Sequence, residues 1–290
     1  MKYAIFLGCT VPVRNLSYEL SARRAAACLG VEFVDIPEFS CCGYPTRSVH
    51  HETSLLLAAR NLALAEERGL DICTLCSACT SVLTEASRKL ATDEGLLEKV
   101  NRSLGAVGRR YLGKVRVKHL ARVFYEDVGP DAIKNAVKRP LDAFRIASHY
   151  GCHYLKPSEI YDRFDHPEVP KSLDELVTAT GAQAVDYATK KECCGGAILA
   201  VDEELALRMA RAKLDDIKAS GADAINLICP FCSVMYGANQ RKIQTKYGAK
   251  YDLPIMYYPQ VLGLALGIDA EELGLSQNPV KPRAILAKIS

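Results

Sequence analysis

Cysteines are the residues best suited to chemistry in this sequence, and ten of the twelve follow one pattern that occurs twice. Each copy contains a single cysteine, an adjacent pair followed by glycine, and a C-x-x-C motif. The first copy comprises Cys9, Cys41, Cys42, Cys76 and Cys79, and the second comprises Cys152, Cys193, Cys194, Cys229 and Cys232. Between the pair and the C-x-x-C motif lie 33 residues in the first copy (43–75) and 34 in the second (195–228). Such a repeat predicts two related modules, each with its own cysteine site.

Thiolates in this arrangement indicate a soft metal, namely zinc, copper(I) or an iron–sulfur cluster. A structural zinc site takes four ligands, which leaves one thiolate of each copy without a role, whereas a cluster with several irons can use all five. An adjacent pair can face one centre only from a turn, and Gly43 and Gly195 allow that turn. The count therefore favours an iron–sulfur cluster in each copy. The alternatives are a zinc-stabilised interaction subunit and a thioredoxin-like dithiol at Cys229 and Cys232.

Other candidate residues lie beside the repeated cysteines or outside the pattern. His149 and His153 flank Cys152, where either could donate a proton or contact a substrate, and a purely structural role is the alternative. Cys28 falls in a helical apolar stretch and is expected to be buried. Cys73 precedes the first C-x-x-C motif by three positions, and we expect a buried strand residue there rather than a substitute ligand.

Short apolar runs precede the cysteines and predict the strands that position them. Residues 3–7 and 143–148 lead to the two single cysteines, and residues 71–75 and 224–228 lead to the two C-x-x-C motifs. Helical periodicity covers residues 18–29, 53–67, 203–218 and 233–245. Strands that alternate with helices predict parallel α/β units, whose ligands bind beyond the carboxyl ends of the strands. We therefore expect the ten cysteines at those ends.

The duplication predicts the fold class: α/β, with two tandem, pseudo-repeated cysteine-rich domains whose short parallel sheets are flanked by helices. A chain of 290 residues is long enough for two cores of ordinary size. We expect the first domain at residues 1–140, where residues 92–140 form a helical connection, and the second domain with the C-terminal tail at residues 141–290.

The double cysteine pattern resembles the tandem CCG domain family, and in particular the CCG-type subunit of heterodisulfide reductase that is designated B. The opening FLGC, the CCGG of residues 193–196, the CPFC of residues 229–232 and the YYPQVLGLALG of residues 257–267 strengthen the resemblance, which spans nearly the whole chain. It implies that each set of five cysteines holds a noncubane [4Fe-4S] cluster and that the two clusters face a cleft. Each cluster would supply one electron to cleave, or take one to form, a disulfide such as that of coenzyme M and coenzyme B.

A second interpretation keeps the fold and changes the role. Related CCG proteins occur in sulfur oxidation and in lactate, glycolate, succinate or fumarate systems, where the domain could relay electrons only. Neither a G-x-G-x-x-G turn nor a P-loop is present, so flavin, NAD and nucleotide sites are not expected. The resemblance implies that electrons come from a small ferredoxin-like subunit with two cubane [4Fe-4S] clusters and, beyond it, from a flavin subunit.

Charge and hydropathy exclude further classes of function. The net charge is only +3 without a long basic block, so no nucleic-acid partner is expected. No apolar run approaches the roughly 18 residues of a membrane span. The N-terminus lacks the basic start and long apolar segment of a signal peptide, so we expect a cytoplasmic protein, where clustered cysteines more often bind metal than form disulfides.

Overall fold

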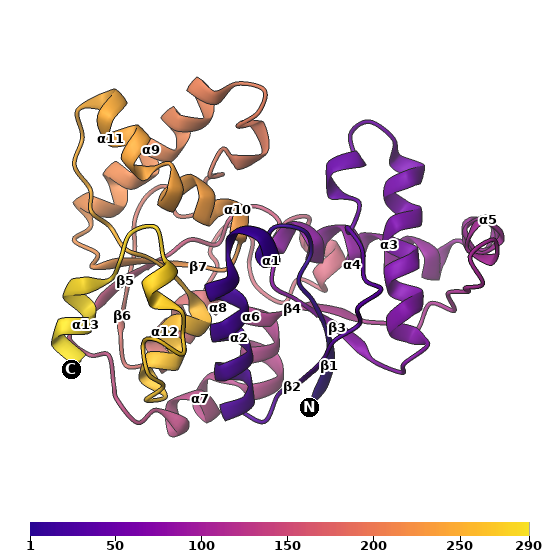
Figure 1. Ribbon diagram of the computed structural model, residues 1–290, viewed down its shortest axis with the longest axis horizontal. Coiled ribbons are helices and arrows are strands. Elements are labelled where there is room, and N and C mark those ends of the chain that lie inside the picture. Colours follow the sequence, from indigo (N-terminus) through magenta and orange to yellow (C-terminus); the bar gives the residue numbers. More distant parts are fainter. Residues whose placement is uncertain (290) are drawn as a thin grey trace.

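The computed structural model describes residues 1–289 and contains two four-stranded sheets, one from each half of the sequence (Figure 1). All neighbouring strands are parallel. In spatial order the first sheet consists of β2 (Glu32–Val34), β1 (Lys2–Phe6), β3 (Asp71–Thr74) and β4 (Val117–His119). The second consists of β6 (Gln183–Val185), β5 (Arg145–Ser148), β7 (Ala224–Leu227) and β8 (Ile255–Tyr257). The predicted duplicated α/β fold is confirmed.

The strand order places the two cysteine sites at equivalent points of the sheets. From β1 and β3, and likewise from β5 and β7, the chain continues outward in opposite directions, so a ligand crevice lies beyond the carboxyl ends of these central strands. Cys9 and Cys76 follow β1 and β3, and Cys152 and Cys229 follow β5 and β7. Each sheet thus brings its single cysteine and its C-x-x-C motif to the same crevice.

Helices connect the strands and cover the sheets. The first half contains α1 (Val11–Arg14), α2 (Leu16–Cys28), α3 (His51–Glu66), α4 (Ser77–Thr92), α5 (Glu94–Gly105), α6 (Leu120–Arg122) and α7 (Pro130–Ala136). The second half contains α8 (Ser172–Ala179), α9 (Glu203–Ala219), α10 (Pro230–Ser233), α11 (Gln240–Tyr247), α12 (Tyr258–Ala265) and α13 (Arg283–Ile289). Helix α9 begins where the Asp202 carboxylate accepts a hydrogen bond from the Leu205 backbone N–H (2.9 Å), an N-cap. The predicted helices at 18–29, 53–67 and 203–218 are confirmed.

Helices from the two halves pack against each other. Helix α2 of the first half contacts α12 of the second, and α7 contacts α8, so α2, α8 and α12 lie together in the middle of the molecule (Figure 1). The rings of Tyr18 on α2 and Tyr257 before α12 are stacked with centroids 3.9 Å apart. These contacts cross the predicted boundary at residue 140, which stays a prediction.

Three local expectations differ from the structure. The connection at residues 92–140 also contains β4, which is only three residues long and gives no readable periodicity. The helix predicted at 233–245 is interrupted by a π-helical turn at Val234–Ala238 between α10 and α11. Cys28, expected in the core, is exposed because it ends α2 on the solvent side. Cys73 is a buried residue of β3, as predicted.

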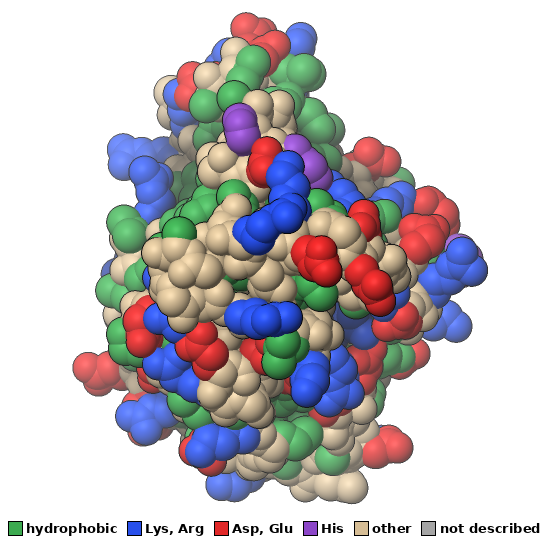
Figure 2. Space-filling model, turned by 90° about the vertical axis from the view of Figure 1, so that its right-hand side faces the viewer, with side chains coloured by type: hydrophobic (Ala, Val, Ile, Leu, Met, Phe, Trp, Pro, Cys, Tyr) green, Lys and Arg blue, Asp and Glu red, His purple; other side chains and the backbone are tan. Residues whose placement is uncertain are grey.

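The surface at the α3–α5 end carries interspersed acidic and basic side chains (Figure 2). Several of them pair, for example Lys99 with Glu52 (2.8 Å) and Lys89 with Glu85 (3.0 Å). Among residues 1–289, no helix combines the length and the apolar character needed to cross a bilayer.

Candidate functional site

A glycine precedes each single cysteine and permits close approach to the C-x-x-C motif. Gly8 has φ +67°, and a Cβ there would lie 2.9 Å from the Cys79 sulfur. Gly151 has φ +69°, and a Cβ there would lie 3.9 Å from the Cys232 sulfur. Side chains other than glycine rarely adopt this left-handed conformation. The loops after β1 and β5 therefore bring Cys9 and Cys152 to their partners through the same backbone turn.

The adjacent pairs are also held by left-handed glycines, as the sequence predicted. Gly43 (φ +94°) donates its N–H to the Cys41 sulfur, and Gly195 (φ +80°) donates to the Cys193 sulfur, both at 3.4 Å. Gly196 donates in turn to the Cys194 sulfur at 3.3 Å. These backbone N–H groups point at sulfur and favour thiolate over thiol.

The first cysteine of each C-x-x-C motif ends a strand and begins a helix. Cys76 is the N-cap of α4 and Cys229 the N-cap of α10, and both have extended backbones. In α4, a helix of 16 residues, the N-terminal dipole adds to the stabilisation of a thiolate.

The thiols of each copy contact one another in a chain of hydrogen bonds. In the first copy these join Cys41 to Cys42, Cys42 to Cys79 and Cys79 to Cys76. In the second they join Cys152 to Cys193, Cys193 to Cys194, Cys194 to Cys232 and Cys232 to Cys229. Cys76 and Cys229 also hydrogen-bond to each other, so the two sets meet at their C-x-x-C motifs. Cys9 differs, because its exposed thiol contacts the Thr10 hydroxyl (3.7 Å).

One thiol in each adjacent pair is strongly acidified by its neighbours. Hydrogen bonds from Cys41 and then Cys79 hold the pKa of Cys42 well below the ordinary thiol value. Hydrogen bonds from Cys152 and Cys194 do the same for the pKa of Cys193. Each copy thus contains a position that stabilises a thiolate, the form of cysteine that binds metals.

A cavity of about 970 Å³ lies between the two sets of cysteines. Its wall includes Cys9, Cys42, Cys76 and Cys79 from the first set and Cys152 from the second. A smaller space of about 50 Å³ adjoins it and is lined by all five cysteines of the second set. Tyr44, His153 and Phe231 line both spaces. The structure therefore brings nine of the ten predicted cysteines to two adjoining spaces, and Cys41 joins them through its contact with Cys42.

The two candidate histidines occupy different positions. His153 lines the cavity, and its Nε2 shares a hydrogen bond of 3.0 Å with the Tyr44 hydroxyl. His149 is 1% exposed, does not line the cavity and packs edge-on against Tyr236. Its buried Nε2 has no hydrogen-bond partner, while its Nδ1 lies 3.2 Å from the Lys213 ammonium nitrogen. Burial lowers the pKa of both histidines.

Sequence reasoning missed several polar residues of the site. Arg47 and Lys156 line the cavity and pair with Glu85 (2.7 Å) and Glu168 (2.6 Å), respectively. Neither lies close to a cysteine in sequence in a way that marks it, although Arg47 follows the first CCG motif by four residues. Lys213 carried a clearer signal, because it falls on the buried stripe of α9 that includes Ala206, Ala210, Leu214 and Ile217.

The donor set fits iron–sulfur clusters. All twelve cysteines are free, and the ten repeated ones present soft sulfur donors around two enclosed spaces. The Cys194 and Cys232 sulfurs and a His149 nitrogen lie within 4.8 Å of one another, close enough to share a metal. Eight of the ten thiols are buried or partly buried, which limits access of water to a bound cluster.

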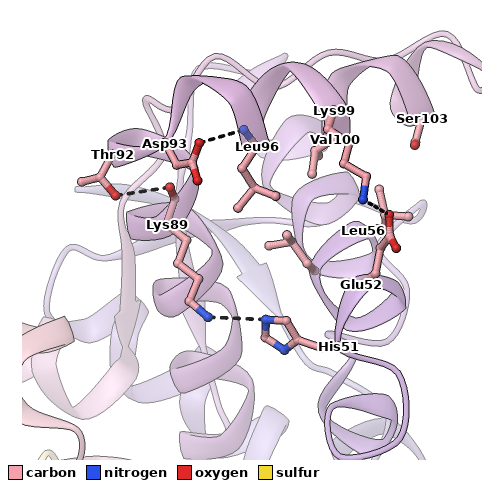
Figure 3. Close-up of a pocket in the computed structure, with 11 residues that line it drawn as sticks. His51, Glu52, Leu56, Lys89, Thr92, Asp93, Leu96, Lys99, Val100 and Ser103 are labelled. Atoms are coloured by element: carbon pink, nitrogen blue, oxygen red, sulfur yellow. Dashed lines mark hydrogen bonds and ion pairs between the residues drawn. The ribbon is translucent and has the colours of Figure 1, made fainter.

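A second hollow of about 580 Å³ lies away from all the cysteines, between α3, α4 and α5 (Figure 3). Its polar side chains pair among themselves: Lys99 with Glu52 (2.8 Å), and Lys89 with His51 (3.4 Å). Asp93 accepts a hydrogen bond from the Leu96 backbone N–H (2.9 Å) and caps α5. This hollow therefore has a structural explanation and no group aimed at a ligand.

Comparison with known proteins agrees with this site. Residues 3–84 and 146–236 match the CCG family, described as a cysteine-rich domain, and each segment contains one complete cysteine set. In Methanosarcina acetivorans, a CoB–CoM heterodisulfide reductase that uses ferredoxin or F420H2 has a subunit, designated B, that is 38% identical to this chain, over 99% of this chain and 97% of that protein. The chain is 32% identical to the membrane anchor subunit of the 8-methylmenaquinol:fumarate reductase of Wolinella succinogenes, over 96% of this chain and 97% of that protein.

A solved structure shares the fold. The crystal structure of a hypothetical protein from Helicobacter pylori superposes with a TM-score of 0.79 at 19% identity. The match covers 97% of this chain and 52% of that one, so this chain spans about half of the larger structure. The matched family, the near full-length relatives and the paired cysteine sites lead to one conclusion: the chain belongs to the CCG cysteine-rich domain family and, within it, to the relatives of the heterodisulfide reductase subunit that is designated B.

Proposed function

We propose that this iron–sulfur subunit cleaves, or forms, a disulfide between two noncubane [4Fe-4S] clusters. Cys9, Cys41, Cys42, Cys76 and Cys79 would hold the first cluster, and Cys152, Cys193, Cys194, Cys229 and Cys232 the second. The observation that carries the proposal is the cavity of about 970 Å³ whose wall contains cysteines of both sets. A molecule in this cavity can approach both centres at once.

When bound, the two clusters would supply one electron each, and two electrons with two protons convert one disulfide into two thiols. The names of the relatives suggest the disulfide of coenzyme M and coenzyme B as substrate. The electrons would come from a small ferredoxin-like subunit with two cubane clusters and, beyond it, a flavin subunit. A reducing cytoplasmic location, which stays a prediction, suits the twelve free thiols.

The residues of this chain would bind the substrate and deliver protons. Arg47 and Lys156 give the cavity wall two cations, which favour a substrate with anionic ends. His153 and Tyr44 share their hydrogen bond at the wall, where either group reaches a leaving thiolate, and we assign proton delivery to this pair. His149, the other candidate proton donor, is separated from the cavity and acts on the second cysteine set instead.

A second candidate function is electron relay without disulfide chemistry. It is favoured by the 32% identity to a subunit of a fumarate reductase, whose name gives no disulfide substrate. Such a relay would contain the same clusters but would leave the cavity without a reacting substrate.

Two measurements test the proposal. Anaerobically purified protein should contain about eight irons and eight acid-labile sulfides per chain. About two zincs without sulfide would instead support a zinc-stabilised interaction subunit. Cluster-loaded protein mixed with a strong one-electron reductant and a panel of disulfides should release two thiols per disulfide. Clusters that undergo reduction without any thiol release would contradict the catalytic role and support the relay.

A further inference from the structure

Asn61 and Lys213 occupy equivalent positions behind the two cysteine sets. A Cβ on Gly43 would meet the Ser54 backbone, and one on Gly195 would meet the Ala206 backbone, so α3 and α9 approach the two CCG turns in the same way. Asn61 and Lys213 each follow that contact by seven residues, which places them two turns further along the same helix face. Both are buried, with exposures of 0% and 1%. One position is neutral and the other carries an ammonium group.

The Lys213 ammonium group is fixed by the segment that leads to Cys193. Its Nζ donates to the backbone carbonyl oxygens of Thr189, Lys190 (3.2 Å) and Glu192 (2.9 Å). The fourth neighbour is His149 Nδ1 at 3.2 Å. Within residues 1–289, no carboxylate oxygen lies within the 4.0 Å of an ion pair with this nitrogen. A buried cation without a carboxylate partner is costly unless another anion lies nearby.

The nearest candidates for that anion are the cysteines of the second set. Cys232, Cys194 and Cys193 all act on the charge of Lys213. His149 connects the ammonium group to two of them. Because its Nδ1 accepts from Lys213, its Nε2 carries the hydrogen, and that buried nitrogen lies near the Cys194 and Cys232 sulfurs without another partner. An N–H donor and a cation thus point toward the same thiolates.

The first copy has neither group. Asn61 accepts a hydrogen bond from the Ser40 N–H (2.9 Å) and donates to the Cys41 carbonyl oxygen (3.1 Å), so it holds the cysteine pair without a charge. Phe6 replaces His149, since each residue lies two positions before the left-handed glycine that precedes the single cysteine. Its ring packs against Phe39 at 5.0 Å. The surroundings of the two cysteine sets are therefore similar in shape and different in charge.

We propose that Lys213, acting directly and through His149, makes the two clusters electrically unequal by raising the reduction potential of the second. A nearby cation stabilises the negative charge that a cluster gains with an electron, and a hydrogen bond to ligand sulfur has the same effect. The second cluster is then the one that takes up the first electron from the external one-electron donor. The inference rests on the proposed function, because it requires that both clusters be present.

A redox titration of the cluster-loaded chain, followed by electron paramagnetic resonance, tests the inference. Lys213→Met should make one-electron reduction of the second cluster at least tenfold less favourable, a shift of about 59 mV, and should change the first cluster less than twofold. Lys213→Arg should retain the wild-type potential. Lys218→Met removes an exposed lysine from the same helix and should shift neither cluster. A Cys193→Ser variant, which loses the second cluster, assigns the remaining signal to the first.

The outcomes separate this inference from the proposed function. Wild-type protein without iron and sulfide would contradict both, whereas loaded protein whose second potential is unchanged in Lys213→Met and Lys213→Gln would contradict the inference alone. Equal shifts of both clusters would also contradict it. If the two neutral variants lose the second cluster, retention of that cluster in Lys213→Arg supports the requirement for charge. Loss in all three variants assigns Lys213 a purely structural role and overturns the inference.

Discussion

His119 donates a hydrogen bond from Nε2 to the backbone carbonyl oxygen of Ile228 (2.9 Å), the residue just before Cys229. The same oxygen accepts a second hydrogen bond from the Tyr18 hydroxyl (3.1 Å). His119 ends β4 of the first sheet, and its Nδ1 accepts from the Ala121 N–H (3.1 Å). Both ring nitrogens thus have the partners that a neutral imidazole requires, and the first half of the chain fixes the C-x-x-C motif of the second.

This arrangement predicts a loss of stability in mild acid. Burial lowers the pKa of His119 to about 4, against 6.5 for an ordinary histidine. The unfolded chain therefore binds a proton between pH 6.5 and 4 that the native chain does not, so stability falls as the pH falls through this range. The expected contribution is about 2.5 kcal/mol between pH 7 and pH 4.5, measurable by urea unfolding.

Replacement of the histidine checks the assignment. His119→Gln should be less stable at pH 7, because it loses the fixed hydrogen bonds, and should show a smaller decrease in unfolding free energy toward pH 4.5. His51→Gln, at the exposed start of α3, is the control and should keep the wild-type pH dependence. An unchanged slope in His119→Gln would show that another group takes up the proton.

Replacement of one ligand should remove one cluster only. In Cys193→Ser we expect iron and sulfide to fall to about half of the wild-type content, because serine is a poor ligand for iron in such clusters. Cys28→Ser changes an exposed thiol outside both sets and should leave the content unchanged. Equal losses in the two variants would contradict the ligand assignment, and metal analysis with circular dichroism distinguishes lost ligation from unfolding.

The glycine of the CCG turn should tolerate no side chain. In Gly43→Ala the new Cβ would lie 2.7 Å from the Ser54 carbonyl oxygen, in addition to the strain of a positive φ. We expect a loss of about 3 kcal/mol or more in unfolding free energy. Gly30→Ala is the matched control, since Gly30 has φ +70° and open space around the added atom, and should cost only about 1–2 kcal/mol. Similar losses would mean that the close approach to α3 is unimportant.

Proton delivery at the cavity should depend on His153. His153→Asn should lower the rate of thiol release by about 10²-fold at unchanged iron content, because it removes the proposed proton donor. Tyr44→Phe removes the hydroxyl that shares the hydrogen bond and should have a smaller effect of about tenfold. His149→Phe, which copies the first half of the chain, should change cluster potential more than thiol release. Wild-type rates in His153→Asn would place proton delivery elsewhere.

The sequence predicted the parts of the site that repeat. The strands before Cys76 and Cys229 were readable because they are continuous apolar runs buried on both faces. Strands β2, β4, β6 and β8 contain three residues each, too few to show a period. The cavity wall was also unreadable, since Arg47 and Lys156 reach it from loops whose paths depend on tertiary packing. Lys213 marks the difference between the two halves, and only superposition of the two cysteine sets reveals Asn61 as its counterpart.

The packing of α2 on α12 has a consequence for how a substrate could be chosen. Tyr18 and Tyr257 stack within a continuous core that joins the halves bearing the two cysteine sets. The distance between these sets is then as fixed as any other dimension of a protein interior. Discrimination among guests would depend on whether they match a chamber of constant width, and not on how tightly two jaws close. For the same reason, cutting the chain at residue 140 should yield two fragments that associate or fail together.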